Sequence, residues 1–168
     1  MKFVVAFSSP KRSAKTVDTA VRHARAMGAE VVLFRVVPDP EKVGVVAQLI
    51  STDRPMDKAK SQVDEVVARL KNAGVAASGV VKVGEVAKSI AEFAREQNAD
   101  LLFIGTTDVM KKGGANSFFF KRDPVVNYLV DHCPVALCLV RTPEIFAAFD
   151  DADDVQGDQP APPPEVSS

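Results

Sequence analysis

The chain has 168 residues, 46% of them apolar and 26% charged, which is ordinary for one globular domain with a sizeable core. Its formal net charge of −1 hides an asymmetry, because residues 150–168 hold six acids and no base, which leaves 16 of the 22 acids and all 21 bases in residues 1–149. This modest basic excess, without a basic stripe interleaved with aromatic residues, argues against nucleic-acid binding. No apolar run approaches the roughly 20 residues of a membrane helix and no signal sequence opens the chain, so we expect a cytoplasmic protein that binds no membrane.

Apolar residues along the chain alternate between continuous runs, typical of strands covered on both faces, and repeats at helical spacing. In chain order, the predicted elements are a strand over 2–7, a helix from 14 to before Gly28, a strand over 30–37, a helix over 57–72 ended by a left-handed Gly74, a strand over 76–83, a helix over 85–97, a strand over 100–107, a long loop, a helix over 124–131 and a strand over 134–140. Residues 41–56 give no clear pattern. The strand over 100–107 is the most apolar, and we expect it to be central.

Strands that alternate with helices predict a parallel α/β sheet with helices on both faces. A ligand of such a sheet binds beyond the carboxyl ends of the strands. We therefore expect a domain over residues 1–142. The remaining 143–168 are acidic and rich in proline, and we expect this tail to be disordered. It is either a solvated appendage or a weak internal competitor for an anionic ligand.

The turn after the first strand, residues 8–13 with the sequence SSPKRS, has two interpretations. Ser9 as N-cap with Pro10 at the first helical position stabilises a helix start without any ligand. Bases at a helix start oppose the helix dipole, however, and favour an anion nearby. The bases here are Lys11, Arg12 and Lys15.

Metal and thiol chemistry have little support in the sequence. Cys133 and Cys138 lack metal-type spacing, and His23 and His132 are the only histidines. We expect two reduced packing cysteines, no metal site and no catalytic residue.

Three stretches together resemble the universal stress protein family over about residues 2–141: FVVAFSSPKRSAKTVDTAVRHARAMGAEVVLFRVV, VKVGEVAKSIAEFAREQNADLLFIGTT and VVNYLVDHCPVALCLV. The most specific part is a strand ending in Gly84, then a helix, then Ala99-Asp100 opening an apolar strand that stops at Gly105. The resemblance implies a three-layer, doubly wound, five-stranded parallel sheet of strand order 3-2-1-4-5, as in the adenine nucleotide alpha hydrolase-like fold. It also implies a homodimer without established catalytic activity. One branch of the family binds ATP and another does not.

The loops depart from the pattern of the ATP-binding branch. The ribose carboxylate of that branch falls on Ser8 and its glycine on Ser9. In the glycine-containing loop that follows the fourth strand of that branch, Gly105 matches the first glycine, but the next glycine falls on Asp108. The resemblance therefore implies a weakened nucleotide site.

The last part of the loop after the fourth strand also departs from the pattern of the ATP-binding branch. The glycine and hydroxyl pair of the ATP-binding branch falls on Phe118 and Phe119, or on Asp123 and Pro124 when the alignment is anchored on residues 125–128. Phe118 to Phe120 either pack on the body or form an exposed patch for a partner subunit or a lid.

The candidates for nucleotide or anion binding lie at the carboxyl ends of the strands or in the segment after residue 108. They are Phe7, Ser8, Ser9, Lys11, Arg12, Ser13, Val36, Gly105, Thr106, Asp108, Lys111, Lys112, Gly113, Gly114, Asn116 and Ser117. The resembled topology puts the last strand at a sheet edge, so the candidates for a dimer interface are Val135, Leu137 and Leu139.

The sequence leads to a non-catalytic, dimeric module of the universal stress type, regulatory or protective, with a degenerate nucleotide-binding cleft. The alternative is a binder of ATP, AMP or another phosphorylated ligand through the rebuilt Lys- and Gly-containing loop, with Mg²⁺ only if a nucleotide binds. An ATP-hydrolysing enzyme ranks third. The expected partners are a second copy of the chain and another protein.

Overall fold

The computed structural model describes residues 1–39, 53–107, 109–113, 117–121 and 123–142. The predictions for the acidic tail, and for Asp108, Gly114 and Asn116, lie outside the described residues.

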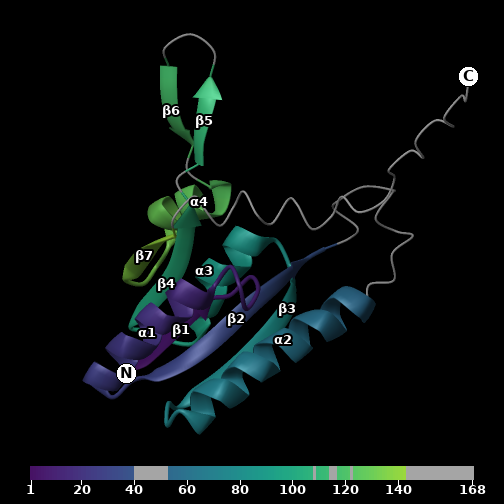
Figure 1. Ribbon diagram of the computed structural model, residues 1–168, viewed down its shortest axis with the longest axis vertical. Coiled ribbons are helices and arrows are strands. Elements are labelled where there is room, and N and C mark those ends of the chain that lie inside the picture. The colour runs from purple at the N-terminus through teal and green to yellow at the C-terminus, as the bar shows by residue number, and fades with distance from the viewer. Residues whose placement is uncertain (40–52, 108, 114–116, 122, 143–168) are drawn as a thin grey trace, which may run out of the picture.

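Five parallel strands form the main sheet in the order β3-β2-β1-β4-β7 (Figure 1). They are β1 (Lys2–Ala6), β2 (Glu30–Pro38), β3 (Ala77–Gly84), β4 (Leu101–Thr107) and β7 (Leu137–Thr142). The predicted order 3-2-1-4-5 is confirmed, with β7 as the fifth strand of this sheet. The prediction that the 100–107 strand is central is wrong, because β1 takes that place. Strand β4 is apolar because the structure buries it on both faces, Phe103 in one core cluster and Leu102 in the other.

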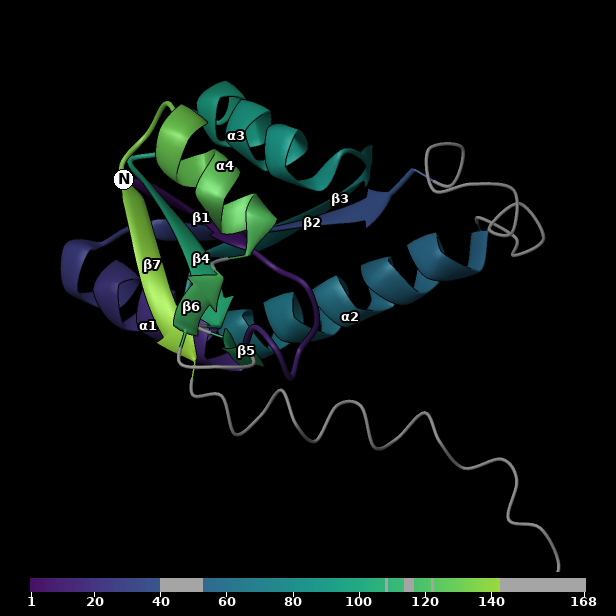
Figure 2. The ribbon, with the colours of Figure 1, turned by 90° about the horizontal axis from the view of Figure 1, so that it is seen from above.

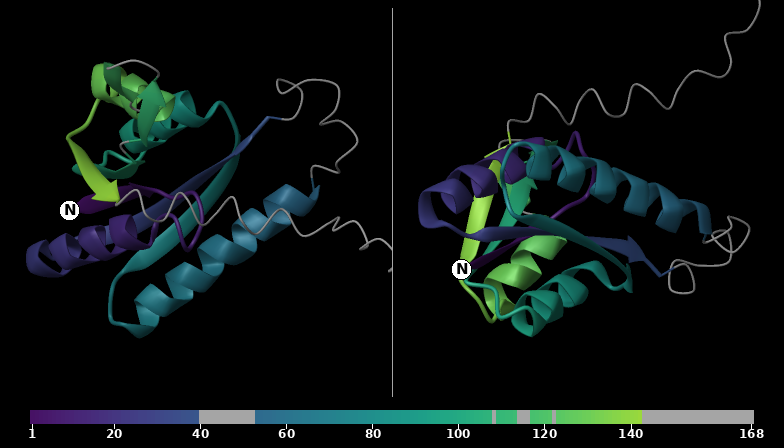
Figure 3. Two further views of the ribbon diagram at one scale, coloured as in Figure 1. Left: turned by 45° about the horizontal axis from the view of Figure 1, so that its top comes forward. Right: turned by 90° about the horizontal axis from the view of Figure 1, so that it is seen from below.

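In the described part of the chain four helices cover the sheet, two on each face, which gives three layers (Figures 2 and 3). Helices α1 (Ala14–Met27) and α2 (Asp53–Asn72) lie on one face, and α3 (Val86–Glu96) and α4 (Pro124–His132) on the other. Successive residues of a strand point to opposite faces, so Phe3 and Val5 join the first core cluster while Val4 joins the second. No helix in the described part of the chain is both long and apolar enough to cross a membrane.

Glycine ends two of these helices in the left-handed region. Gly28 follows α1 with φ of 64° and Gly74 follows α2 with φ of 75°, as the sequence predicts for Gly74. Two boundaries differ from the predicted ones. Helix α2 begins at Asp53 rather than Asp57, because Pro55 is tolerated in the first turn of a helix. The last strand begins at Leu137 rather than Pro134, which has no N–H to donate.

The segment predicted as a long loop contains a second, two-stranded sheet, so that prediction is wrong. Strands β5 (Val109–Gly113) and β6 (Ser117–Lys121) pair as an antiparallel hairpin that projects from the carboxyl end of β4 (Figure 1). Valine and phenylalanine favour strands, although the two strands also contain three lysines and a glycine.

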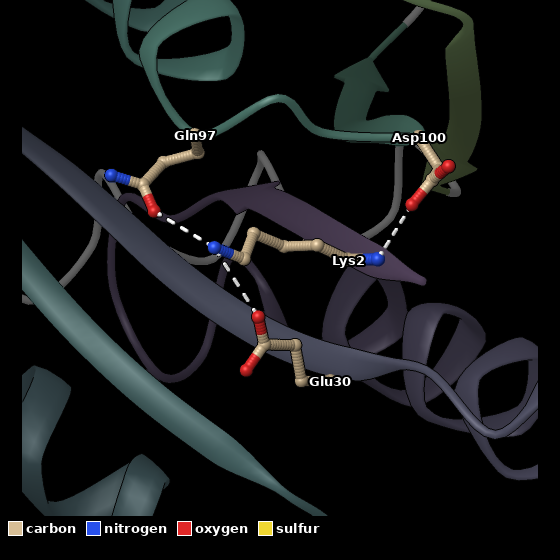
Figure 4. A network of polar contacts seen from close by, with 4 residues as sticks. All are labelled: Lys2, Glu30, Gln97 and Asp100. Carbon is tan, nitrogen blue, oxygen red and sulfur yellow. Dashed lines mark hydrogen bonds and ion pairs between the residues drawn. The ribbon is translucent and has the colours of Figure 1, made fainter.

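A polar network ties the amino ends of three strands together (Figure 4). The backbone N–H of Lys2 donates to Oδ2 of Asp100 at 2.7 Å, and Lys2 Nζ lies 3.3 Å from Oε1 of Glu30 and donates to Oε1 of Gln97 at 3.2 Å. Asp100 N–H donates in return to the Lys2 carbonyl at 2.9 Å. This edge of the sheet is therefore held by its own side chains, and the opposite, carboxyl edge is where a ligand could bind.

Candidate functional site

The carboxyl edge of the sheet has its switch point between β1 and β4. The chain moves from β1 to β2 on one side, whereas β4 lies on the other side of β1. Phe7 directly follows β1 and is buried, and its N–H donates to the Phe34 carbonyl at 2.8 Å. Ser8 is the first exposed residue after the strand. In doubly wound sheets this is the place where ligands bind.

The three serines of the following turn are used to hold the turn itself. Ser13 Oγ is buried and accepts the N–H of Ser8 at 2.9 Å, and it lies 3.3 Å from Ser8 Oγ. Ser9 Oγ accepts the N–H of Arg12 at 3.2 Å, and the Ser9 carbonyl accepts the N–H of Ser13 at 3.0 Å. Ser9 therefore caps a turn that precedes the helix, rather than α1, whose N-cap is Ser13. These contacts fit the interpretation of residues 8–13 as a capped corner.

Positive charge gathers at this edge. Lys11, Arg12 and Lys15 are exposed at the start of α1, whose first turn contains no acid. Exposed Arg141 of β7 pairs in the register with Thr106 of β4. Bases near a helix N-terminus are stabilised by an anion, so the edge suits a negatively charged group.

Gly105 has a packing reason to be glycine. A Cβ at this position would lie 2.8 Å from Oγ1 of Thr16, which is 1% exposed. The Thr16 hydroxyl finds no hydrogen-bond partner among the described residues. The close approach of α1 to β4 therefore excludes a side chain at 105, whether or not a ligand binds there. No signal in the sequence points to Thr16, since nothing in its spacing separates it from a core residue of α1.

The start of α4 is occupied by a carboxylate. Asp123 is the N-cap, and its Oδ1 accepts the N–H of Val125 at 2.7 Å, while Pro124 at the first helical position has no N–H to offer. A helix N-terminus binds phosphate through free amides and its dipole. At α4 a resident negative charge already uses the first available amide.

The other candidates are spread over different places. Val36 is half-buried and packs on the core cluster beneath α3 and α4. Lys111, Lys112, Gly113 and Ser117 belong to the β5–β6 hairpin, which stands apart from the β1–α1 turn in Figure 1 instead of folding over it. This hairpin was not predicted from the sequence, where its signal is a cluster of phenylalanines beside a glycine-rich stretch.

Nucleophilic or metal chemistry finds no support in the described residues. Burial raises the pKa of the Cys138 thiol, which keeps it protonated and a poor nucleophile. Within the ranges that the structure describes, no three side chains of His, Cys, Asp or Glu come together as a metal site. The carboxyl edge of the sheet therefore presents the backbone and hydroxyl groups of the turn over residues 8–13, with basic residues around them.

The fold and the position of this edge define the class: a doubly wound α/β protein of the adenine nucleotide alpha hydrolase-like fold, with its candidate site at the β1–β4 switch point. The model of the universal stress protein family matches residues 1–141, and the chain belongs to that family. A sequence comparison with curated proteins found no match.

Solved structures share the fold at low sequence identity. A universal stress protein from Archaeoglobus fulgidus has a TM-score of 0.62 and 20% identity, over 83% of this chain and 97% of that chain. One from Archaeoglobus fulgidus in complex with dAMP has a TM-score of 0.58 and 20% identity, over 83% of this chain and 96% of that one. A family protein from Arabidopsis thaliana with AMP bound has a TM-score of 0.55 and 16% identity, over 84% of this chain and 91% of that one.

Proposed function

We propose that this chain is a non-catalytic regulatory or protective module of the universal stress type, acting in the cytoplasm as a homodimer and on a protein partner, with a degenerate nucleotide site in the domain of residues 1–142. The observation that carries the proposal is the Asp123 carboxylate on the start of α4, 2.7 Å from the Val125 nitrogen. A nucleotide phosphate placed there would meet a negative charge instead of free amides.

The magnitudes support a weakened site. Ser8 in place of a ribose-binding carboxylate loses a charge-assisted hydrogen bond of about 1.5 to 3 kcal/mol. A phosphate charge about 4 Å from the exposed Asp123 carboxylate adds repulsion of about 1 kcal/mol at the dielectric constant of water. The exposed bases Lys11, Arg12 and Lys15 offset part of this cost.

The second candidate is a true binder of ATP, AMP or another phosphorylated ligand. Two family structures hold dAMP and AMP, and the carboxyl edge of this chain carries exposed bases. Lysines and glycine of the hairpin would then form the phosphate site, with Mg²⁺ only alongside a nucleotide. ATP hydrolysis stays the third candidate, because no nucleophile with an adjacent base is found at the edge among the described residues.

Isothermal titration calorimetry with ATP and with adenosine separates these candidates. For the degenerate site we expect ATP to bind no tighter than about 10 μM, and adenosine to bind about as well as ATP because the phosphates gain nothing. Asp123→Asn keeps an oxygen for the cap and removes the charge, so it should tighten ATP binding about threefold to tenfold and leave adenosine unchanged.

The matched control for that substitution is Asp131→Asn, which removes an exposed charge from the other end of α4. It should leave both affinities unchanged. Submicromolar ATP binding that survives replacement of Lys11, Arg12, Lys111 and Lys112 by alanine would overturn the proposed degenerate site. Submicromolar ATP binding that those replacements abolish would establish the second candidate.

The homodimer is proposed to form through β7, which is one of the two edge strands of the main sheet. Leu139 on β7 is 40% exposed, whereas Leu137 and Val135 are half-buried and pack against the core beneath α3 and α4. An uncovered apolar edge strand invites pairing with another chain. Leu139 is therefore the position that tests the interface without disturbing the core.

We expect Leu139→Lys to shift sedimentation velocity from dimer to monomer, because a lysine on an edge strand opposes pairing. Val83→Lys is the matched control, since Val83 is 44% exposed on β3, the opposite edge strand. A dimer that persists in Leu139→Lys and dissociates in Val83→Lys would place the interface at β3.

A further inference from the structure

The β5–β6 hairpin and the C-terminal tail leave the main sheet side by side. Strands β4 and β7 are parallel neighbours, and their register pairs Thr107 with Thr142. The hairpin starts at Val109 and the tail at residue 143. Because paired strands lie about 4.8 Å apart, the two segments emerge about one strand spacing from each other at the same edge.

The two segments carry opposite charges. The described hairpin strands contain three bases and no acid; the bases are Lys111, Lys112 and Lys121. The tail, residues 143–168, contains no base, and its acids are Glu144, Asp150, Asp151, Asp153, Asp154, Asp158 and Glu165. Opposite charges tethered this closely attract each other more effectively than two separate molecules would.

The hairpin is a separate two-stranded sheet and does not pair with the main sheet. A two-stranded hairpin is marginally stable by itself in water, and β5–β6 stands clear of the five-stranded sheet (Figure 1). Its register puts Lys111 opposite Phe119 and Lys112 opposite Phe118. The register therefore pairs a base with an aromatic residue at two successive positions of the hairpin.

The tail has the matching composition. Its first residues, PEIFAAF over 143–149, supply Ile145, Phe146 and Phe149, and the acidic stretch DDADD follows at 150–154. A segment that is first apolar and then acidic suits a hairpin that has lysines on β5 opposite phenylalanines on β6. The eight residues from Thr142 to Asp150 reach about 26 Å when extended, which exceeds the roughly 17 Å length of a five-residue strand.

We propose that residues 143–154 bind the β5–β6 hairpin of the same chain, with the acids of 150–154 paired to its lysines and the apolar residues of 145–149 set against Phe118 to Phe120. The tail thereby stabilises the hairpin and covers its aromatic residues. Any other partner of this hairpin has to displace the tail first. The interaction needs no nucleotide, and a phosphorylated ligand held by Lys111 and Lys112 would compete with it.

Hydrogen–deuterium exchange of the full chain, followed by mass spectrometry of peptides from 109–121, tests this. We expect replacement of Asp150, Asp151, Asp153 and Asp154 by asparagine to speed exchange in these peptides about tenfold, because several exposed ion pairs are lost together. Replacement of the same four residues by glutamate keeps the charge and should leave exchange unchanged. Raising the salt to about 1 M, where the Debye length is about 3 Å, should speed exchange in the unaltered chain.

Two controls accompany these variants. Peptides of β1 should exchange equally in every variant, which shows that the domain stays folded. Glu165→Gln removes a charge outside the proposed contact and should have no effect. If hairpin exchange is as slow in the asparagine variant and at high salt as in the unaltered chain at low salt, the proposal is overturned. It is also overturned if the protection of the hairpin disappears on dilution, because the occupant would then be a second copy of the chain.

Discussion

Phe103→Ala is expected to lower the free energy of unfolding by about 3 to 5 kcal/mol, a large fraction of the roughly 5 to 15 kcal/mol that holds a domain together. Phe103 is 0% exposed in β4, and its ring centroid lies 5.5 Å from that of Phe3 and 5.6 Å from that of His23. Removing the ring takes away buried apolar area and leaves a cavity that the neighbouring strands cannot close. Urea unfolding followed by circular dichroism measures the loss.

The control for Phe103 is Met27→Ala, which shortens a side chain that is 49% exposed at the end of α1. It should change stability by less than about 0.5 kcal/mol, as surface substitutions usually do. A loss below about 1 kcal/mol in Phe103→Ala would show that the core beneath α1 collapses around the missing ring.

Gly79→Ala is expected to destabilise the protein by about 1 to 3 kcal/mol, although it adds only one methyl group to a strand. A Cβ on Gly79 would overlap Cγ1 of Val63 and lie 3.1 Å from Cγ2 of Val67. Val63 is 1% exposed, and its branched side chain has few alternative rotamers, so α2 would have to move away from β3. The same unfolding measurement applies.

A double-mutant cycle identifies the cause of that loss. Val63→Ala removes the methyl groups that the new Cβ meets, so Gly79→Ala should cost less in the Val63→Ala background than in the unaltered chain. Ser78→Ala, at an exposed neighbouring position of β3, should change stability by less than about 0.5 kcal/mol. Additive effects of Gly79→Ala and Val63→Ala would exclude a steric cause.

Much of the fold follows from the sequence alone, because local signals agree with each other. The apolar run before Ser8, the helical spacing up to Gly28 and the left-handed Gly74 each predict an element that the structure contains. Alternation of strands and helices predicts the parallel sheet, since right-handed crossovers leave few other arrangements. The strand order came from the resemblance of residues 2–141 to a family, and both the sheet and the family match confirm it.

The details of the candidate site depend on contacts between segments far apart in the chain. Spacing shows that Ser13 lies near a helix start, but only the folded turn shows that its hydroxyl accepts the N–H of Ser8. Gly105 looks like half of a phosphate loop in the sequence, whereas the structure shows that Thr16 of α1 leaves no room for a Cβ there.

The β5–β6 hairpin and its position were decided by tertiary structure. Its strands are short and mix charged with aromatic residues, so no clear alternation marks them, and their pairing depends on register rather than on the propensity of either segment. The register of β4 with β7 then places the hairpin beside the start of the tail. The sequence by itself determined the class of fold and the family, because these rest on local patterns. Which side chains meet at the carboxyl edge depends on non-local packing, and only the tertiary structure could decide it.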